Sequence, residues 1–256
     1  MHAPGIDYRL TDAVLDPPDA DVEGMETPVR LPHAFFCYTP PPAWGGDLAV
    51  SELPALERGA MTFGAFNEMA KVTTDCLTAW AKVLNAVKGS RLLWRARCFE
   101  EAAARELGYA RLHKLGLQRS QVDLLPMDSA PARHMAIYSQ VDIHLDTFPY
   151  TGGTTTCDAL WHGVPVVTLQ GVRPSDRLGA TVLHHVGRDE WIAHCSEAYV
   201  DIALRLAGDV MALQHCRATL RQQFAASPMH DAAGFARGFE HVCRNRLATH
   251  RHAVVA

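Results

Sequence analysis

The chain has 256 residues and a formal net charge of −4; 48% of its residues are hydrophobic and 20% are charged. This composition is typical of globular proteins and excludes an intrinsically disordered one, and the length allows one large domain, or one domain and part of a second, with an ample core. Because neutralising the phosphates of nucleic acids needs clustered Lys and Arg, the slightly acidic charge and the lack of a long basic run argue against a nucleic-acid-binding protein.

The first segment, residues 1–57, is rich in proline and acidic residues, as in the run Asp16-Pro17-Pro18-Asp19. Two short apolar stretches within it, 7–12 and 29–38, are predicted to be strands, and no helix is expected. Such a segment cannot bury a core alone, so we expect it to pack against the rest of the chain. We therefore interpret residues 1–57 as the end of a preceding domain plus a linker, and residues 58–256 as the folded domain.

From Met61 onward, predicted strands and helices alternate. The strands are expected at 61–66, 91–96, 122–125, 141–145 and 164–169, with a short edge element at 189–192. The helices are expected at about 74–88, 98–115, 130–140, 154–161, 175–186, 197–206, 210–225 and 234–249. Thr73 or Thr74 is expected to cap the first helix, and Ser196 the one at 197–206. This alternation predicts an α/β fold with a doubly wound, mostly parallel (Rossmann-like) sheet, followed by C-terminal helices and preceded by an irregular extension.

Residues 141–169 form the most informative stretch, predicted as strand, loop, helix and strand. The loop contains Gly152 and Gly153, and threonines follow at 154–156, where a hydroxyl can cap the helix by accepting from a free backbone N–H group. The same N–H groups, the hydroxyls and the positive end of the helix dipole also suit a phosphate. The local sequence leaves both interpretations open, but it matches neither the P-loop nor the dinucleotide-binding fingerprint.

Three further residues are candidates for the same ligand. Lys71 follows the first strand of the alternating region, where its ammonium could neutralise a diphosphate; the alternative is a solvated loop lysine. Asp158 lies one turn past Thr154 and could accept from a ribose diol, or it could be a surface charge that the helix dipole favours. His134, in the predicted helix 130–140, could bind a phosphate or a base, or could be a partly buried polar residue.

Support for a metal site or a disulfide framework is weak. His184 and His185 are adjacent and point to different faces of a helix, and His144 and Asp146 share a strand face without a third ligand. The 7 cysteines are odd in number and include no C-x-x-C pair, which favours reduced thiols. Because no apolar run of membrane-spanning length and no signal peptide is visible, we expect a soluble, cytoplasmic protein without a membrane partner.

Several motifs, in order along nearly the whole chain, resemble the protein O-GlcNAc transferases, the SPINDLY-like group. The motifs that resemble the C-terminal catalytic half of that family are FNEMAK at 66–71, VDIHLDT at 141–147 and GGTTTCDALWHGVPVVT at 152–168. Residues 7–12 and LPHAFF at 31–36 resemble the end of the family's N-terminal catalytic half, and the run at 226–228 also fits. Several motifs in a shared order are more specific than any one of them.

The resemblance implies the C-terminal half of a GT-B glycosyltransferase that moves GlcNAc from the donor UDP-GlcNAc to Ser or Thr of proteins, with inversion and without a metal cofactor. By position, Lys71 matches the lysine that stabilises the UDP leaving group, while Asp158 matches a carboxylate on the ribose and His134 a histidine near the nucleotide. Thr154 and Thr155 match hydroxyl and backbone contacts to the diphosphate. The implied catalytic residue is Lys71, and the implied nucleotide-sugar-binding residues are Asn67, Glu68, His134, Gly153, Thr154, Thr155 and Asp158.

The chain departs from this family at several positions. Glu68 stands where an amide is common, which brings a negative charge near the diphosphate, Pro131 replaces a donor-binding lysine of the animal enzymes, and Gly153 replaces their histidine. Most of the N-terminal catalytic half has no counterpart, so residues 1–57 resemble a remnant of it plus a linker, and the resemblance leaves open a fragment, a truncated reading frame and a donor-binding remnant. The alternatives are a non-catalytic or degenerate nucleotide-sugar-binding half that lacks the acceptor side, and a different GT-B activity.

Overall fold

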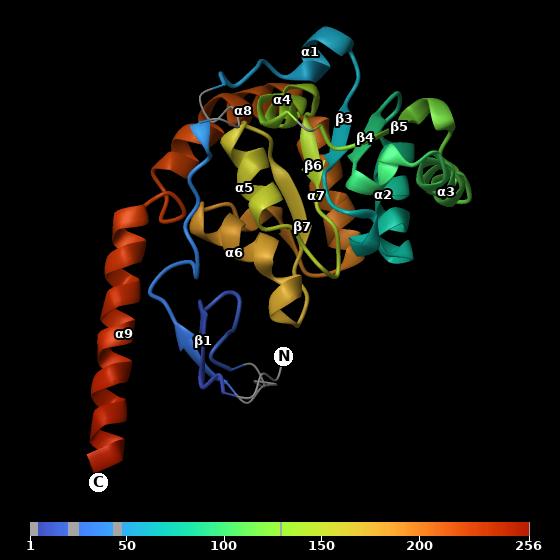
Figure 1. Cartoon of the computed structure of the whole chain (residues 1–256). Helices are drawn as coiled ribbons and strands as arrows, with labels where there is room; N and C mark the ends of the chain where they lie inside the picture. Colours follow the sequence, from blue (N-terminus) through green and yellow to red (C-terminus); the bar gives the residue numbers. More distant parts are fainter. Residues whose placement is uncertain (1–4, 20–25, 43–47, 129, 256) are drawn as a thin grey trace.

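Six parallel strands form the central sheet. The computed structural model describes residues 5–19, 26–42, 48–128 and 130–255; within them the strand order is β5-β4-β3-β6-β7-β8, and each neighbouring pair is parallel (Figure 1). The strands are β3 (Thr62–Ala65), β4 (Arg91–Arg95), β5 (Val122–Leu125), β6 (Ile143–Leu145), β7 (Val166–Leu169) and β8 (Ile192–Ala193). The sheet confirms the predicted α/β fold with a doubly wound, parallel arrangement.

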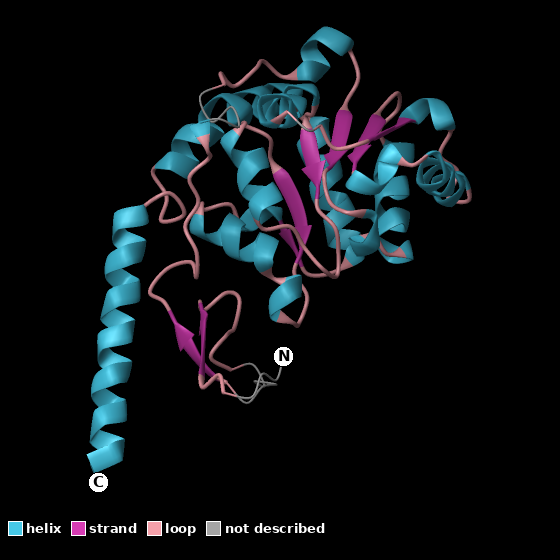
Figure 2. Cartoon of the chain, viewed as in Figure 1, coloured by secondary structure: helices cyan, strands magenta, loops and turns pink. Residues whose placement is uncertain are grey.

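Helices cover both faces of the sheet (Figure 2). On one face α2 packs against α7, and on the other α5 packs against α6 and α8. The helices of the described residues are α1 (Pro54–Arg58), α2 (Thr74–Ala86), α3 (Ala102–His113), α4 (Pro131–Ala136), α5 (Thr154–Trp161), α6 (Leu178–His185), α7 (Ser196–Gly208), α8 (Val210–Ala225) and α9 (Ala232–Val255). The side chains of residues 131, 132, 134 and 247–255 lie outside the description.

The strand order reverses between β3 and β6, which are neighbours at the centre of the sheet. From β3 the chain moves outward to β4 and β5, and it then returns to β6 and continues outward on the other side. Loops at such a switch point diverge and leave a crevice at the carboxyl ends of the strands. Because Lys71 lies in the turn after β3, and residues 152–156 lie at the end of the loop after β6 and in the first turn of α5, the fold brings these predicted site residues to one place.

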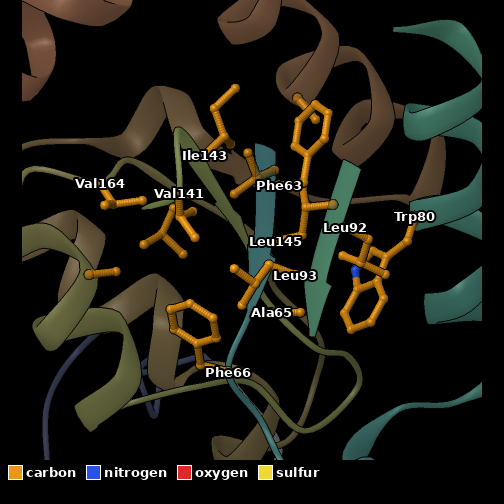
Figure 3. Close-up of a cluster of buried hydrophobic side chains, with 14 of the residues drawn as sticks. Phe63, Ala65, Phe66, Trp80, Leu92, Leu93, Val141, Ile143, Leu145 and Val164 are labelled. Atoms are coloured by element: carbon orange, nitrogen blue, oxygen red, sulfur yellow. The ribbon is translucent and has the colours of Figure 1, made fainter. Parts of the chain in front are cut away.

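Apolar side chains of the strands and their covering helices form the core (Figure 3). Phe63 on β3 and Ile143 and Leu145 on β6 are fully buried, as expected for parallel strands covered on both faces. Trp80 on α2 and Trp94 on β4 meet edge to face, with ring centroids 5.6 Å apart. This close packing holds the strand ends, and with them the loops of the crevice, in fixed positions.

The N-terminal extension forms a pair of parallel strands, β1 (Tyr8–Thr11) and β2 (Thr27–Arg30). The predicted strand at 29–38 is therefore wrong beyond Arg30. A side chain replaces the strand ladder there, because the Asp12 carboxylate accepts a hydrogen bond from the Phe35 N–H group at 3.0 Å. The rest of that stretch consequently follows an irregular path toward the crevice.

The prediction that residues 1–57 contain no helix is also wrong, because α1 begins at Pro54. Proline suits the first position of a helix, where its missing N–H group would have no partner. The next N–H group, of Ala55, donates to the buried Asp142 carboxylate at 2.9 Å. This short helix is thus stabilised by a side chain far away in the sequence. The interpretation of residues 1–57 as a remnant of another domain stays a prediction.

The two predicted helix caps have different outcomes. The Thr73 hydroxyl accepts from the Cys76 N–H group at 3.2 Å and caps α2, as predicted. Ser196 does not cap α7, because Cys195 takes the cap position and its Sγ accepts from the Ala198 N–H group at 3.4 Å. The helix predicted at 98–115 is divided, with a short 3-10 turn before α3.

The last helix, α9, extends away from the sheet beside the N-terminal strands (Figure 1). It runs through Val255 and is longer than the predicted 234–249. The Arg246 guanidinium lies 5.3 Å from the ring centroid of Tyr8, within reach of a cation–π contact. Helix α9 and the N-terminal extension are therefore in contact.

Candidate functional site

A pocket of about 360 Å³ opens at the carboxyl ends of the central strands. Its walls come from the loops after β3 and β6, the start of α5 and the irregular segment after β2. Its lining residues are Phe35, Phe36, Asn67, Lys71, Tyr150, Gly153, Thr154, Thr155 and Leu178. The structure therefore brings together Asn67, Lys71, Gly153, Thr154 and Thr155, which the sequence predicted as one site.

The N-terminus of α5 opens on this pocket without a side-chain cap. Gly153 takes the cap position, and the first helical hydrogen bond runs from the Cys157 N–H group to the Gly153 carbonyl at 3.0 Å. The prediction that the threonines cap the helix is wrong, because they lie inside its first turn. Thr154 is exposed and Thr155 is half-buried. The first-turn N–H groups and the helix dipole therefore suit an anionic ligand.

Gly152 makes the tight turn before α5 possible. Its N–H group donates to the Asp146 carboxylate at 2.8 Å. A Cβ atom on this residue would lie 2.5 Å from Thr155 Oγ1 and 2.9 Å from Asp146 Oδ1, which is closer than real Cβ contacts. Only glycine lets the loop approach both groups, so this residue sets the position of the α5 N-terminus.

Lys71 is half-buried and reaches into the pocket from the short turn after β3. Its ammonium lies 3.4 Å from the Thr151 carbonyl oxygen, 3.5 Å from Asn67 Oδ1 and 4.1 Å from the ring centroid of Tyr150. Burial lowers the pKa of Lys71, while the negative charges of Asp146 and Glu68 act in the opposite direction. The alternative of a solvated loop lysine does not hold, because protein groups surround the ammonium.

Asp158 lies on α5 but is only 4% exposed, and it is not among the residues that line the pocket. Its carboxylate accepts a hydrogen bond from the Tyr38 hydroxyl. Burial raises the pKa of Asp158 to about 6, and the hydrogen bond from Tyr38 lowers it in part. The alternative of a surface charge is therefore wrong, whereas the contact with a ribose stays a prediction.

We expect Tyr38→Phe to make stability more sensitive to pH, since the buried Asp158 carboxylate loses its donor and its folded-state pKa rises further. A carboxyl with a raised folded-state pKa loses stability as pH rises through that pKa. Thermal unfolding should thus differ little from the parent protein near pH 5, and the free energy of unfolding should be about 1–3 kcal/mol lower above pH 7. Tyr109→Phe, on α3, serves as the control. A loss that is equal at all pH values would contradict this assignment.

Two further predicted site residues, Glu68 and His134, have different outcomes. Glu68 precedes the turn that carries Lys71, is exposed and is not among the residues that line the pocket. His134 belongs to α4, but its side chain lies outside the described part of the structure. The structure therefore leaves the role of His134 as a prediction.

The prediction missed the aromatic part of the wall, Phe35, Phe36 and Tyr150. Phe35 and Phe36 meet edge to face with ring centroids 4.9 Å apart, and both come from the stretch predicted as a strand. Tyr150 covers the Lys71 ammonium. Two adjacent aromatic residues after the Leu31-Pro32-His33 run were the signal available in the sequence, since a strand with one buried face would alternate apolar and polar residues.

Among the described residues, no group of three His, Cys, Asp or Glu side chains could hold a metal ion. His144 is buried, its Nε2 accepts from the Phe66 N–H group at 3.2 Å, and burial lowers the pKa of His144 to about 3. His184 instead pairs with Asp189, 2.8 Å away. None of the helices in the described part of the chain is both long and apolar enough to span a membrane.

Comparison with known proteins gives consistent matches. Residues 49–239 match the family described as Glycosyl transferase family 41. The chain is 43% identical over 242 residues to the probable UDP-N-acetylglucosamine–peptide N-acetylglucosaminyltransferase SPINDLY of Solanum lycopersicum, covering 94% of this chain and 26% of the relative. The protein of the same name from Oryza sativa is 45% identical with the same coverage. The chain thus spans about a quarter of the length of these curated relatives.

Solved structures agree on the fold. The chain superposes on a mutant O-GlcNAc transferase of Thermobaculum terrenum with a TM-score of 0.83 and 31% identity, covering 93% of this chain and 44% of that one. Sucrose-phosphate synthase of Thermosynechococcus elongatus gives a TM-score of 0.57 at 12% identity, covering 88% of this chain and 54% of that one, which shows a shared fold alone. The α/β domain therefore has the fold of one half of a GT-B glycosyltransferase.

Proposed function

The chain belongs to glycosyl transferase family 41, and on this basis we propose that its pocket binds UDP-GlcNAc as the donor of a sugar transfer. The proposed reaction is metal-independent, inverting transfer of GlcNAc to Ser or Thr hydroxyls of an acceptor protein in the cytoplasm. Support comes from the names of the relatives, which give a UDP-N-acetylglucosamine–peptide transferase, and from the shared fold.

One observation carries the proposal: the uncapped N-terminus of α5 and the Lys71 ammonium line the same pocket. When the bond between sugar and UDP breaks, negative charge develops on the departing diphosphate. Backbone N–H groups, a helix dipole and an ammonium held in place can stabilise that charge without reorganising. In this scheme the protein supplies the positive charge that a metal ion supplies in other transferases.

The remaining residues receive roles around that diphosphate. Thr154 and Thr155 donate hydroxyl and backbone hydrogen bonds to it, and Lys71 neutralises it. Asp158 accepts from the ribose diol and shares its carboxylate with Tyr38, which holds it in place. Asn67, Glu68, Gly153 and His134 complete the nucleotide-sugar-binding set.

Titration with UDP tests this proposal. We expect calorimetry to show binding of UDP to the purified chain, and Thr155→Val to weaken it by roughly three- to tenfold, because one hydroxyl is lost from the α5 N-terminus. Thr219→Val, on α8 and remote from the pocket, is the matched control and should bind UDP like the parent. If no heat of UDP binding is detected for the parent chain, the site assignment fails.

A second candidate function is a nucleotide-sugar-binding half without transfer activity. The observation that favours it is that the described residues form a single α/β domain with an extension, while a GT-B active site lies between two domains. We expect this 256-residue chain, assayed alone with UDP-GlcNAc and an acceptor protein, to transfer little or no sugar. Robust turnover would exclude the non-catalytic candidate.

A further inference from the structure

Beneath the pocket lies a buried carboxylate that the proposed reaction does not use. Asp146 ends β6 and is fully buried, and four hydrogen bonds surround its two oxygens. Its Oδ1 accepts from the Thr147 N–H group at 2.9 Å, the Gly152 N–H group at 2.8 Å and Asn67 Nδ2 at 3.2 Å. Its Oδ2 accepts from the Thr168 hydroxyl at 2.8 Å. The donors come from the loops after β3 and β6 and from β7, so this one side chain joins all three.

Asp146 also fixes which way the Asn67 amide points. Because Nδ2 of Asn67 donates to the carboxylate, Oδ1 faces the other way and lies 3.5 Å from the Lys71 ammonium. The same carboxylate holds the Gly152 N–H group, next to Thr151, whose carbonyl oxygen lies 3.4 Å from that ammonium. Two of the groups around Lys71 are therefore placed by Asp146.

We propose that Asp146 is the positioning residue of this site: it holds Asn67 and the loop before α5 in the orientation that directs the Lys71 ammonium into the pocket, and its negative charge keeps that ammonium protonated there. It acts through other residues, since it is sealed from the pocket by the side chains and backbone that it binds. The inference rests on the proposed function only in its last step, the contact of Lys71 with a diphosphate.

The negative charge of Asp146 also favours the protonated form of Lys71. Burial raises the pKa of Asp146 to about 6, so near neutral pH the side chain is mostly an anion close to the ammonium. The other titratable groups facing it are Cys76 on α2 and Tyr199 on α7, and burial raises the pKa of both, which keeps them neutral. Burial lowers the pKa of Lys71, and the negative charge of Asp146 opposes this lowering more strongly than that of Glu68 does.

Asp146→Asn is a sharp test because it removes the charge and can retain all four hydrogen bonds. The amide oxygen can replace Oδ1, and the amide nitrogen can donate to Thr168, whose hydroxyl can accept. With only four lysines in the chain, labelling lysine for NMR allows Lys71 to be titrated without any ligand. We expect Asp146→Asn to shift the Lys71 titration to lower pH by about one unit. The decline of UDP affinity at alkaline pH should shift equally.

The matched control is Asp142→Asn, at the other end of the same strand. Asp142 is also buried and accepts from two backbone N–H groups, those of Ala55 and Thr62. Asp142→Asn should lower the free energy of unfolding and leave the pH at which Lys71 titrates unchanged. If Lys71 titrates at the same pH in Asp146→Asn as in Asp142→Asn, the proposal is overturned.

A measurement on the parent chain covers the case in which Asp146→Asn does not fold. Protonation of Asp146 should give the Lys71 signal a second, smaller inflection near pH 6. Glu68→Gln should retain this inflection, which separates Asp146 from the exposed carboxylate; its absence in the parent would overturn the proposal. Because these readouts need no UDP, a parent chain that shows them but binds no UDP refutes the proposed function and not the positioning role.

Discussion

Lys71→Ala should weaken the binding of UDP by roughly 30- to 100-fold, the largest loss expected from any single substitution in the pocket. A charge-assisted contact to a diphosphate contributes about 2–3 kcal/mol when the ammonium is partly shielded from water. Lys71 meets that condition, because it is half-buried among Tyr150, Asn67 and the Thr151 carbonyl. Calorimetric titration with UDP at pH 7 measures the effect.

The pH dependence of Lys71→Ala provides a second readout. Since burial lowers the pKa of Lys71, UDP affinity of the parent chain should fall as pH rises through that lowered pKa, where the ammonium loses its proton. The variant has no such group, and its weak binding should not show this fall. Lys82→Ala, which removes an exposed lysine from α2, is the control. Equal UDP affinity of the two variants would remove Lys71 from the site.

Arg217→Leu should lower the free energy of unfolding by about 3–5 kcal/mol, which is the expected cost of leaving several buried acceptors without their donor. Arg217 is 1% exposed on α8. Its guanidinium donates to the carbonyl oxygens of Ser51 and Val141 at 2.8 Å and of Tyr138 at 3.1 Å. Leucine would leave these acceptors buried without this donor.

Arg217→Leu also tests whether this guanidinium holds three distant segments of the chain together. The guanidinium connects the segment before α1, the turn after α4 and the start of the β6 region, so its loss should loosen all three. Differential scanning calorimetry should show a midpoint lowered by about 10 °C. Arg205→Leu, at an exposed position on α7, should change stability by about 1 kcal/mol or less. A midpoint equal to that of the control would show that other donors replace the guanidinium.

Elements with strong local signals were predictable from the sequence. The strand β5 and the helix α8 have the predicted bounds, because clear turn residues or a capping Asp209 separate them from their neighbours. The turn before α5 and the lysine after β3 were also predictable, since both lie where a parallel sheet binds ligands. These features depend on residues close together in the chain.

Features set by distant contacts were not predictable. The sequence left open whether Asp158 contacts a ribose or is a surface charge, and neither interpretation foresaw that Tyr38, 120 residues earlier, covers it and donates to it. Phe35 leaves the predicted strand because Asp12 holds its N–H group. The cap of α5 was missed for a local reason: Gly153 can take the cap position without a side chain, and the threonines then enter the helix.

Gly179 and Gly152 lie on opposite sides of the Asp146 carboxylate, and this arrangement limits how the sequence can diverge. A Cβ atom on Gly179 would lie 2.6 Å from Asp146 Oδ2, and one on Gly152 would lie 2.9 Å from Oδ1, so small residues enclose the carboxylate from both sides. A longer side chain at position 146 therefore has no room, and a Cβ atom at 152 or 179 would also lie 2.5 Å from Thr155 Oγ1 or 2.6 Å from Thr168 Oγ1. The carboxylate, the two glycines and the threonines beside them therefore form one interlocked set, and we expect a larger residue at either glycine position to be tolerated only together with changes at several of the others.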